Sequence, residues 1–248
     1  MNVDGVEVTP MLDAIGLIGS YAELYPDVPA ESWAPYRERH PELFAGDKWR
    51  LPCTSFVLRS GGRTVLVDTG VGPPGLWGWE PEVEGRLVEE VDPADVDIVF
   101  LTHLHIDHVG WNADADGRPL FRRYVVHEGA LAFVRTHDDR PHVQRAIVPI
   151  DFETISGETE LAPNIVAFEA PGHYPGHMAI RLGDEGILLA DVAVHPALLD
   201  HPEWRYVSDI DYERSVETRR GLLPELEGKV VLCGHYPGDG RPISAMTT

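Results

Sequence analysis

Cysteine, basic residues and long apolar runs are scarce in this sequence, and each scarcity excludes something. The 248 residues include two cysteines, Cys53 and Cys233, which could form at most one disulfide and do not form a CxxC pair. This usage fits a reduced, cytoplasmic setting. No stretch approaches the roughly 18 consecutive apolar residues of a transmembrane helix, and the first residues lack the basic region of a secretory signal. We therefore predict a cytoplasmic protein with no membrane partner.

Basic residues are about half as frequent as acidic ones. The chain has 20 lysines and arginines against 41 aspartates and glutamates, which gives a formal net charge of −21. An acidic surface repels the phosphates of nucleic acids and of anionic lipids. A small molecule is therefore the expected partner, and nucleic acid is not.

Length and hydrophobic content together predict one domain over residues 1–248. Hydrophobic residues make up 43% of the chain, which is enough for a sizeable core, and layered α/β folds commonly reach about 250 residues. Residues 10–50 are rich in proline and aromatic residues. We expect them to form an arm that packs over the core or makes a contact in a homodimer.

Strands and helices alternate along the rest of the chain. Apolar and β-branched runs, the first two joined by a Gly61-Gly62 turn, predict strands at 55–59, 64–68, 97–101, 124–127, 165–169, 178–182, 186–190 and 230–233. Helices are predicted at 81–91, at 128–136 and from an Asp211 cap to about 223, with a loop at 70–79 and a polar connector at 137–160. Strand-rich halves that each end in a helix predict two packed sheets with helices outside.

Six consecutive residues carry four ligand-type side chains, those of His103, His105, Asp107 and His108. Histidine and aspartate suit zinc and similar divalent ions. In an extended segment the first two histidines point the same way, because side chains alternate with a period of two. The run also follows an apolar strand, and active sites in α/β folds commonly lie past the C-terminal ends of strands. The run therefore predicts a metal site rather than a solvated polar turn.

Three later segments place further ligand-type residues beside apolar strands. The segment 171–177, rich in proline and glycine, presents His173 and His177 in a tight loop. Asp191 ends an otherwise apolar strand, where an unpaired buried charge would be costly and a cation would supply its partner. His235 follows the last predicted strand. We expect these residues to join the histidine run at one site.

These residues and their order resemble the metallo-β-lactamase-fold hydrolase superfamily. The HxHxDH run, the PGHxxGH segment, the strand-end Asp191, the late Gly234-His235 and the earlier segment Val67-Asp68-Thr69-Gly70 fall in that family's order, over about residues 55–240. The resemblance implies an α/β (α+β) fold, a four-layer αββα sandwich of two mixed β-sheets flanked by helices. It also implies two divalent metal ions per chain, Zn²⁺ first, with Mn²⁺, Fe²⁺ or Co²⁺ as alternatives.

The resemblance further implies a role for each ligand-type residue. One metal would be held by His103, His105 and His173, and the second by Asp107, His108 and His235, with Asp191 bridging the two. Asp68 and His177 would support the ligands from behind. Two such ions lower the pKa of a shared water from 15.7 to about 7, so that a metal-bound hydroxide attacks the substrate. Asp107 would then help to relay the proton.

Within that superfamily, the branch of N-acyl-homoserine-lactone lactonases and methyl-parathion-type hydrolases is the most similar. The likeness lies in the Pro-rich arm, the segment 190–196 and the helix before His235, and it implies a small, fairly apolar lactone, ester or phosphotriester as substrate. Many lactonases have a tyrosine three residues after the bridging aspartate, where this chain has Val194. Stabilisation of the oxyanion would then come from another group. The residues predicted to line the substrate pocket are Trp77, Trp79, Tyr174, Val194, His195 and Tyr236.

Two alternatives stay open at this point. A thioesterase or glyoxalase-II-like hydrolase would share the metal site, but its anionic thioester usually needs a basic patch. The adjacent arginine pairs Arg122-Arg123 and Arg219-Arg220 are the candidates for such a patch. A non-catalytic binding protein on the same fold would generally have lost ligands, whereas all seven are present here.

Overall fold

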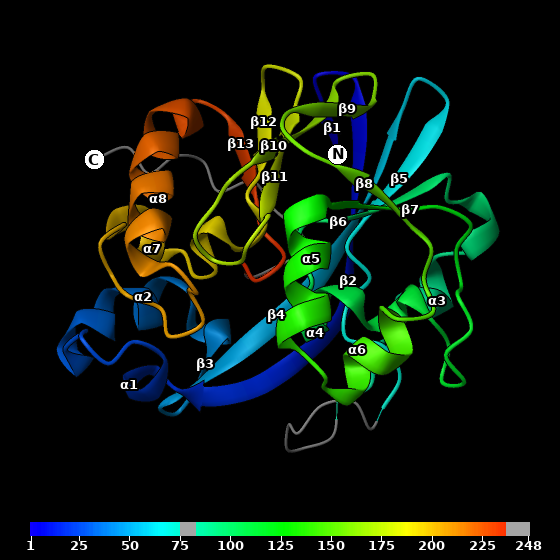
Figure 1. Ribbon diagram of the computed structural model, residues 1–248. Helices are drawn as coiled ribbons and strands as arrows, with labels where there is room; N and C mark the ends of the chain where they lie inside the picture. Colours follow the sequence, from blue (N-terminus) through cyan, green and yellow to red (C-terminus); the bar gives the residue numbers. More distant parts are fainter. Residues whose placement is uncertain (75–82, 237–248) are drawn as a thin grey trace.

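The computed structural model describes residues 1–74 and 83–236, and these form two β-sheets (Figure 1). The larger sheet follows the order β1 (Asn2–Val3), β2 (Val6–Ser20), β4 (Lys48–Ser60), β5 (Arg63–Val67), β6 (Ile98–Leu101), β7 (Tyr124–His127), β8 (Phe152–Ile155), with β3 (Phe44–Ala45) paired to β4. The smaller sheet has the order β13 (Val230–Leu232), β12 (Gly186–Leu188), β11 (Met178–Leu182), β10 (Ile165–Glu169), β9 (Thr159–Ala162).

Both sheets are mixed. In the larger sheet β5, β6, β7 and β8 are parallel neighbours, whereas β1, β2, β4 and β5 pair antiparallel. In the smaller sheet β12 and β13 are parallel and the remaining neighbours are antiparallel. Parallel neighbours place their carboxyl ends at one edge of a sheet, where ligands commonly bind.

Helices cover the outer face of each sheet and complete four layers. The two sheets pack against each other through apolar side chains of their inner faces, such as Leu58 and Ile180. The outer face of the larger sheet packs, in a cluster that includes Leu131, against α3 (Leu87–Glu90), α5 (Glu128–His137) and α6 (Pro141–Ala146). The outer face of the smaller sheet packs, in a cluster that includes Leu222, against α7 (Ala197–Asp200) and α8 (Tyr212–Leu226). The predicted αββα sandwich is confirmed.

The N-terminal arm differs from its prediction in its first half. Residues 10–20 belong to β2, a 15-residue strand that pairs with β4 along its length. Pro10 and two glycines hide this strand in the sequence. β1 pairs only with the first residues of β2, Val6 and Glu7. Pro10 lies beyond them, where this edge of β2 has no partner strand among the described residues, so the N–H that proline lacks removes no ladder hydrogen bond. The second half forms α1 (Tyr21–Leu24), α2 (Ala34–Arg39) and 3₁₀ turns at Ala30–Trp33 and Pro41–Leu43, which pack on the smaller sheet.

Three other local predictions are corrected. The connector at 137–160 contains α6, β8 and the start of β9. β8 and β9 are four-residue strands at the edges of their sheets, too short to show a clear alternation. The helix at 81–91 is confined, within the described residues, to α3. The strand at 186–190 ends at Leu188, because Ala190 takes a left-handed φ of 47° and opens a 3₁₀ turn at Ala190–Ala193. The predicted Asp211 cap is confirmed: its side chain accepts a hydrogen bond from the Arg214 N–H at 3.0 Å.

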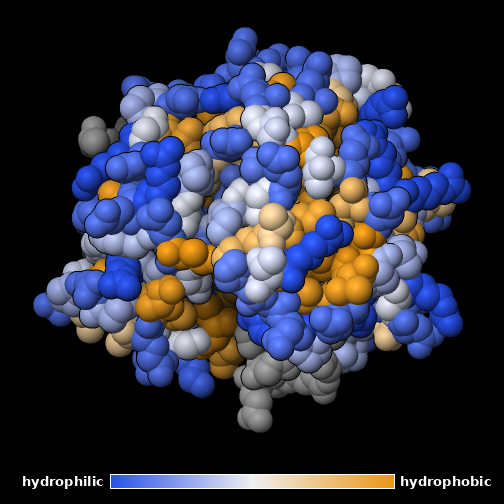
Figure 2. Space-filling view, viewed as in Figure 1, coloured by the Kyte–Doolittle hydropathy of each residue, from blue (hydrophilic) through white to orange (hydrophobic). Residues whose placement is uncertain are grey.

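The surface reflects the acidic composition. Hydrophilic residues predominate on the face shown in Figure 2, and apolar residues gather near its centre and in a hollow below and to the left of the centre. In the same view of Figure 1 this hollow lies between the arm, with α1 and β3, and the α5 side of the molecule. Among the described helices none is long and apolar enough to cross a membrane.

Candidate metal centre

The ligand-type side chains all follow the carboxyl ends of strands. His103 and His105 come after β6 and lead into the short helix α4 (Ile106–Val109), which carries Asp107 and His108. The remaining three follow β10, β12 and β13, and they are His173, Asp191 and His235. Because these ends meet where the two sheets join, residues 132 positions apart in the chain, from 103 to 235, reach one site.

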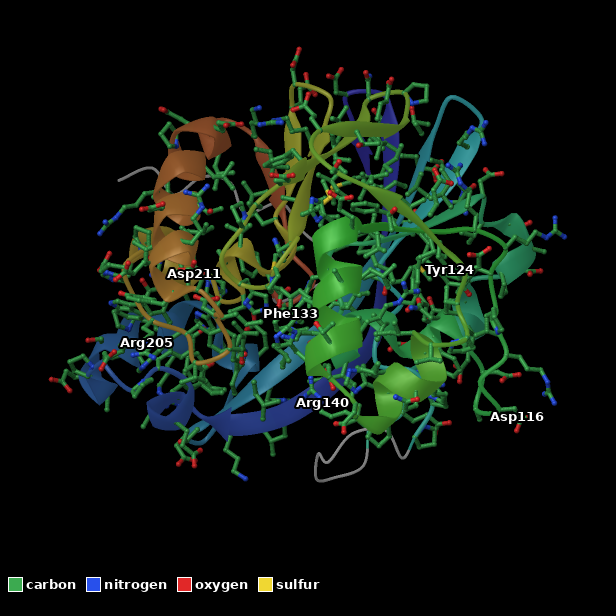
Figure 3. The ribbon with its side chains drawn as sticks, viewed as in Figure 1. Asp116, Tyr124, Phe133, Arg140, Arg205 and Asp211 are labelled. Carbon is green, nitrogen blue, oxygen red and sulfur yellow. The ribbon has the colours of Figure 1, made fainter. Side chains whose placement is uncertain are left out.

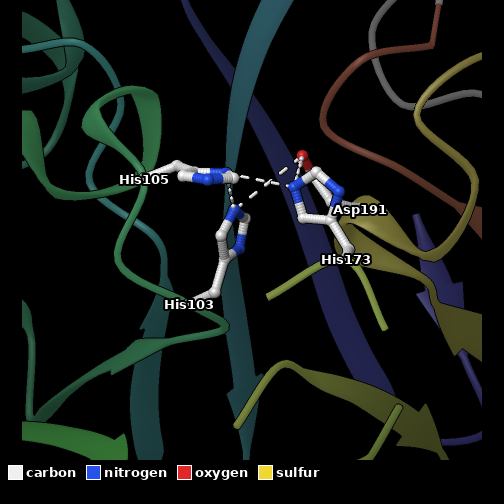
Figure 4. Close-up of side chains that lie close together, drawn as sticks. All are labelled: His103, His105, His173 and Asp191. Atoms are coloured by element: carbon white, nitrogen blue, oxygen red, sulfur yellow. Dashed lines mark hydrogen bonds and ion pairs between the residues drawn. The ribbon is translucent and has the colours of Figure 1, made fainter. Parts of the chain in front are cut away.

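The first group joins three imidazoles and one carboxylate (Figure 4). The Nδ1 atom of His105 lies 3.0 Å from the Nε2 atoms of both His103 and His173. The Oδ2 atom of Asp191 lies 3.3 Å from Nε2 of His173 and 3.8 Å from Nε2 of His103. Four donor atoms of the types that zinc prefers therefore face one point.

The second group lies on the other side of the same carboxylate. The Oδ1 atom of Asp191 is 3.4 Å from Nε2 of His108 and 3.3 Å from Nε2 of His235. The Oδ2 atom of Asp107 approaches the same two nitrogens at 3.8 and 3.6 Å. Asp191 thus presents one oxygen to each group, which is the geometry of a bridging carboxylate. The structure brings together all seven residues that the resemblance implies.

Acceptors behind the histidines fix which ring nitrogen faces the site. Nδ1 of His108 donates to the Asp68 carboxylate at 2.8 Å, and Nδ1 of His235 donates to the Pro52 carbonyl at 2.7 Å. Nδ1 of His173 donates to the Asp209 carboxylate at 3.0 Å. Since these oxygens only accept, the proton sits on Nδ1, and each Nε2 lone pair is left to face the cluster, as in known metal sites.

The electrostatics of the cluster suit positive ions. Burial, reinforced by the neighbouring imidazoles, holds the pKa of His103 and His105 well below the usual range. Burial would also lower the pKa of His108 and His235, but the Asp191 carboxylate outweighs it and raises both values. The buried carboxylates thus favour positive charge at this side of the cluster.

Two buried atoms test whether divalent ions fit. Neither Nε2 of His108 nor Oδ1 of Asp191 makes a hydrogen bond within the described residues. Buried polar atoms of this kind are normally satisfied. A divalent cation accepts lone pairs from both an imidazole nitrogen and a carboxylate oxygen. The residues present therefore fit a pair of such cations.

Asp68 supports the cluster through four contacts. Besides His108, its carboxylate accepts from the backbone N–H of Thr102 at 2.8 Å and from the Thr102 hydroxyl at 2.9 and 3.1 Å. Its backbone has a left-handed φ of 59°. A non-glycine residue pays for this conformation, and such strain gathers at functional sites.

His177 supports the cluster through the backbone. Its Nδ1 donates to the Ala170 carbonyl at 3.0 Å, and its Nε2 accepts from the Asp191 N–H at 3.1 Å. Accepting this bond requires a neutral ring, and burial lowers the pKa of His177 to about 3. His177 thus connects the loop after β10 to Asp191, whose carboxylate faces both groups of ligands.

Two further buried carboxylates near the site could not be predicted from the sequence. Asp209, which orients His173, also accepts from Nη1 of Arg219 at 3.0 Å, and both side chains are 1% exposed. Asp13 lies where the β2–β4 register shifts, and its carboxylate accepts from the N–H groups of Val71 and Leu87, each at 2.6 Å. Neither stands in a motif, and only the folded chain brings them to their partners.

The residues predicted to line the substrate pocket differ in how the structure describes them. Tyr174 is buried, with its ring centroid 4.9 Å from that of His105 and 5.1 Å from that of Phe133, which Figure 3 labels on α5. Val194 and Tyr236 are buried as well. Trp77 and Trp79 lie outside the described residues.

His195, also predicted to line the pocket, is enclosed by aromatic rings. It is 0% exposed, and its ring lies 5.2–6.2 Å from five aromatic rings of the arm and β4, those of Tyr21, Trp33, Tyr36, Phe44 and Trp49.

Comparison with known proteins relates this fold and site to one family. The Metallo-beta-lactamase superfamily matches residues 49–235. An N-acyl homoserine lactonase of Bacillus thuringiensis is 26% identical over 163 residues, which cover 58% of this chain and 63% of that protein. The chain thus matches less than two thirds of that relative's length. The N-acyl homoserine lactonase AttM of Azorhizobium caulinodans is 28% identical over 234 residues, covering 77% of this chain and 84% of that protein.

Solved structures share the fold. AidC, described as a dizinc quorum-quenching lactonase in complex with a product, superposes with a TM-score of 0.80 at 18% identity, covering 97% of this chain and 90% of that one. The hydrolase AbOPH superposes with a TM-score of 0.79 at 20% identity, covering the same shares.

Proposed function

This chain belongs to the metallo-beta-lactamase superfamily, and from that premise we propose that it is a dinuclear metal-dependent hydrolase of a small, fairly apolar lactone or ester. One observation carries the proposal: the two oxygens of Asp191 face two separate groups of imidazoles. A single metal site would need only one of these groups.

The chain's own residues would bind and orient two cations. His103, His105 and His173 would hold one, while Asp107, His108 and His235 would hold the other, with Asp191 shared. When bound, two divalent ions, Zn²⁺ first, would supply Lewis acidity and an activated water at neutral pH. Asp68, Asp209 and the Pro52 carbonyl keep the ligating nitrogens unprotonated on the side of the site.

Asp107 is placed to move the proton. Its side chain is 13% exposed, against 6% for Asp191. Its Oδ2 lies beside the second group, 3.6 Å from Nε2 of His235. It can therefore take a proton at Oδ2 and pass it to solvent.

A phenol beside the first group could bind the developing oxyanion. The Tyr174 ring packs on His103 and His105, and its hydroxyl makes no hydrogen bond within the described residues. Burial raises the pKa of Tyr174, so the hydroxyl keeps its proton as a donor. This residue would take the role of the tyrosine that Val194 replaces.

The substrate class is supported by the relatives and by charge. Relatives at 26–28% identity are N-acyl homoserine lactonases, and a net charge of −21 disfavours anionic substrates. One arginine of each pair that a glutathione thioester would need is engaged: Arg123 pairs with Glu153 at 2.9 Å and Arg219 with Asp209 at 3.0 Å. The thioesterase alternative is therefore less well supported.

A substrate panel tests the proposal. Lactones, aryl esters, phosphotriesters and thioesters matched in acyl chain should be given to metal-depleted and metal-restored chain. We expect hydrolysis of lactones and esters that disappears on depletion and returns with Zn²⁺. Thioesters turned over faster than the matching lactones would move the assignment to the alternative. Activity that survives depletion would overturn it.

A further inference from the structure

A cysteine lies beside the second group of ligands. Cys53, on β4, is 1% exposed. Its Sγ, a carboxylate oxygen of Asp107 and a ring nitrogen of His235 all lie within 4.8 Å of one another. Asp107 comes from the end of the larger sheet and His235 from the end of the smaller one, so the thiol lies where the two sheets meet.

Hydrogen bonds on both sides of Cys53 fix this position. The N–H of Thr54 donates to the Gly234 carbonyl at 3.0 Å, and Nδ1 of His235 donates to the Pro52 carbonyl at 2.7 Å. A Cβ at Gly234 would lie 2.8 Å from the Thr54 carbonyl oxygen, so only glycine allows so close an approach. These backbone contacts therefore hold the thiol beside His235.

The thiol's surroundings also favour a ligand. Its hydrogen bond to the Leu51 carbonyl is long, at 3.9 Å. By contrast the Sγ of Cys233 approaches the Ala190 carbonyl at 3.1 Å. The same side of the site holds two buried atoms without a hydrogen bond in the described residues, Nε2 of His108 and Oδ1 of Asp191. The sulfur, oxygen and nitrogen donors of Cys53, Asp107 and His235 thus lie together, and His235 is shared with the group that holds these two atoms.

We propose that Cys53 is a further ligand of the cation held by Asp107 and His235. The inference rests on the proposed dinuclear centre. On binding, the S–H bond breaks, its proton leaves to solvent, and a sulfur–metal bond forms without oxidation or reduction. Thiolate ligands favour zinc and other soft or borderline ions, whereas carboxylate and water sites suit Mg²⁺ and Mn²⁺. The second position should therefore bind Zn²⁺ or Co²⁺ in preference to Mn²⁺.

Cobalt spectroscopy of the full chain tests this ligand. Cobalt(II) bound to protein gives visible d–d bands whatever its ligands, and a thiolate ligand adds a sulfur-to-cobalt charge-transfer band in the near ultraviolet. Because the chain has two cysteines, Cys233→Ala is a matched control. We expect both kinds of band in the unmodified chain and in Cys233→Ala, and loss of the charge-transfer band alone in Cys53→Ala and Cys53→Ser.

The outcomes separate this inference from the proposed function. Visible bands without a charge-transfer band in the unmodified chain would overturn the thiolate ligand and leave the dinuclear centre standing. A band that persists in Cys53→Ala and vanishes in Cys233→Ala would overturn it too. Failure to bind cobalt would overturn both proposals. X-ray absorption of the zinc-loaded, unmodified chain needs no variant: it should show a zinc–sulfur distance of about 2.3 Å beside the shorter nitrogen and oxygen distances.

Discussion

Replacing Asp209 by asparagine should weaken the first metal position without touching a ligand. The substitution removes the charge that orients His173 through its Nδ1 proton. Changes of this kind behind a ligating histidine typically cost about 10- to 100-fold in metal affinity, which corresponds to about 1.4–2.7 kcal/mol. The affinity for zinc should be measured by competition with a chelator.

The same substitution should also cost folding stability, for a separate reason. Arg219 would lose its buried carboxylate, and breaking a buried ion pair costs about 3–5 kcal/mol. We expect the lower end of that range, because the guanidinium also donates to three carbonyls, those of Pro202, Trp204 and Val192. Urea unfolding of the metal-free chain measures this cost.

Glu217→Gln is the matched control. It breaks an exposed ion pair on α8, the helix that carries Arg219; in this pair Arg214 and Glu217 lie 2.8 Å apart. Such surface pairs contribute about 0–1 kcal/mol, and zinc affinity should not change. If Asp209→Asn lowers stability but leaves zinc affinity at the level of this control, the positioning role is refuted and Asp209 is structural only.

Three further predictions follow from buried groups. Asp13→Ala should destabilise the chain by at least about 3 kcal/mol in urea unfolding, since it leaves three donors without a partner, the N–H groups of Val71 and Leu87 and the Trp111 indole N–H; a loss below 1 kcal/mol would contradict this. Burial lowers the pKa of His195 from 6.5 to about 3. Between pH 6.5 and about pH 3 only the unfolded chain therefore binds a proton at this ring. The free energy of unfolding should fall by up to about 1.4 kcal/mol per pH unit as the pH drops through that range. His195→Asn should flatten that slope, and an unchanged slope would show that the ring titrates in the fold. Asp68→Asn should reduce zinc affinity at the second position by about 10- to 100-fold, and unaltered affinity in chelator competition would contradict the role of Asp68.

The ligands could be predicted from the sequence because each one is local to a strand end. His103, His105, Asp107 and His108 are contiguous, and Asp191 stands out as a charge that ends an apolar run. Their convergence then follows from the packing of the two sheets. Their roles as ligands remain a prediction until metal is measured.

Asp13 and Asp209 could not be predicted, because their partners are set by register and docking. Asp13 is aimed by a β-bulge between Leu12 and Ala14, which leaves no pattern in the sequence. Asp209 reaches His173 only when α8 docks and brings Arg219 beside it. The aromatic rings of the arm enclose His195, and only the folded chain brings them around it.

The secondary structure missed in the sequence has a common cause. β8 has no buried side chain and β9 buries only its last two, so the alternation that marks a strand is weak. β2 carries Pro10 and Gly16, residues that disfavour a strand. Both cases were decided by pairing with a neighbouring strand, which a single segment does not reveal.

Metal stoichiometry tests the central claim most directly. Metal-depleted chain should be titrated with Zn²⁺ while bound metal and hydrolysis of a lactone or aryl ester are measured on the same sample. The account predicts about two zinc ions per chain at saturation and activity that rises with them. Fewer than about one ion per chain, with hydrolysis indifferent to a chelator, would contradict it.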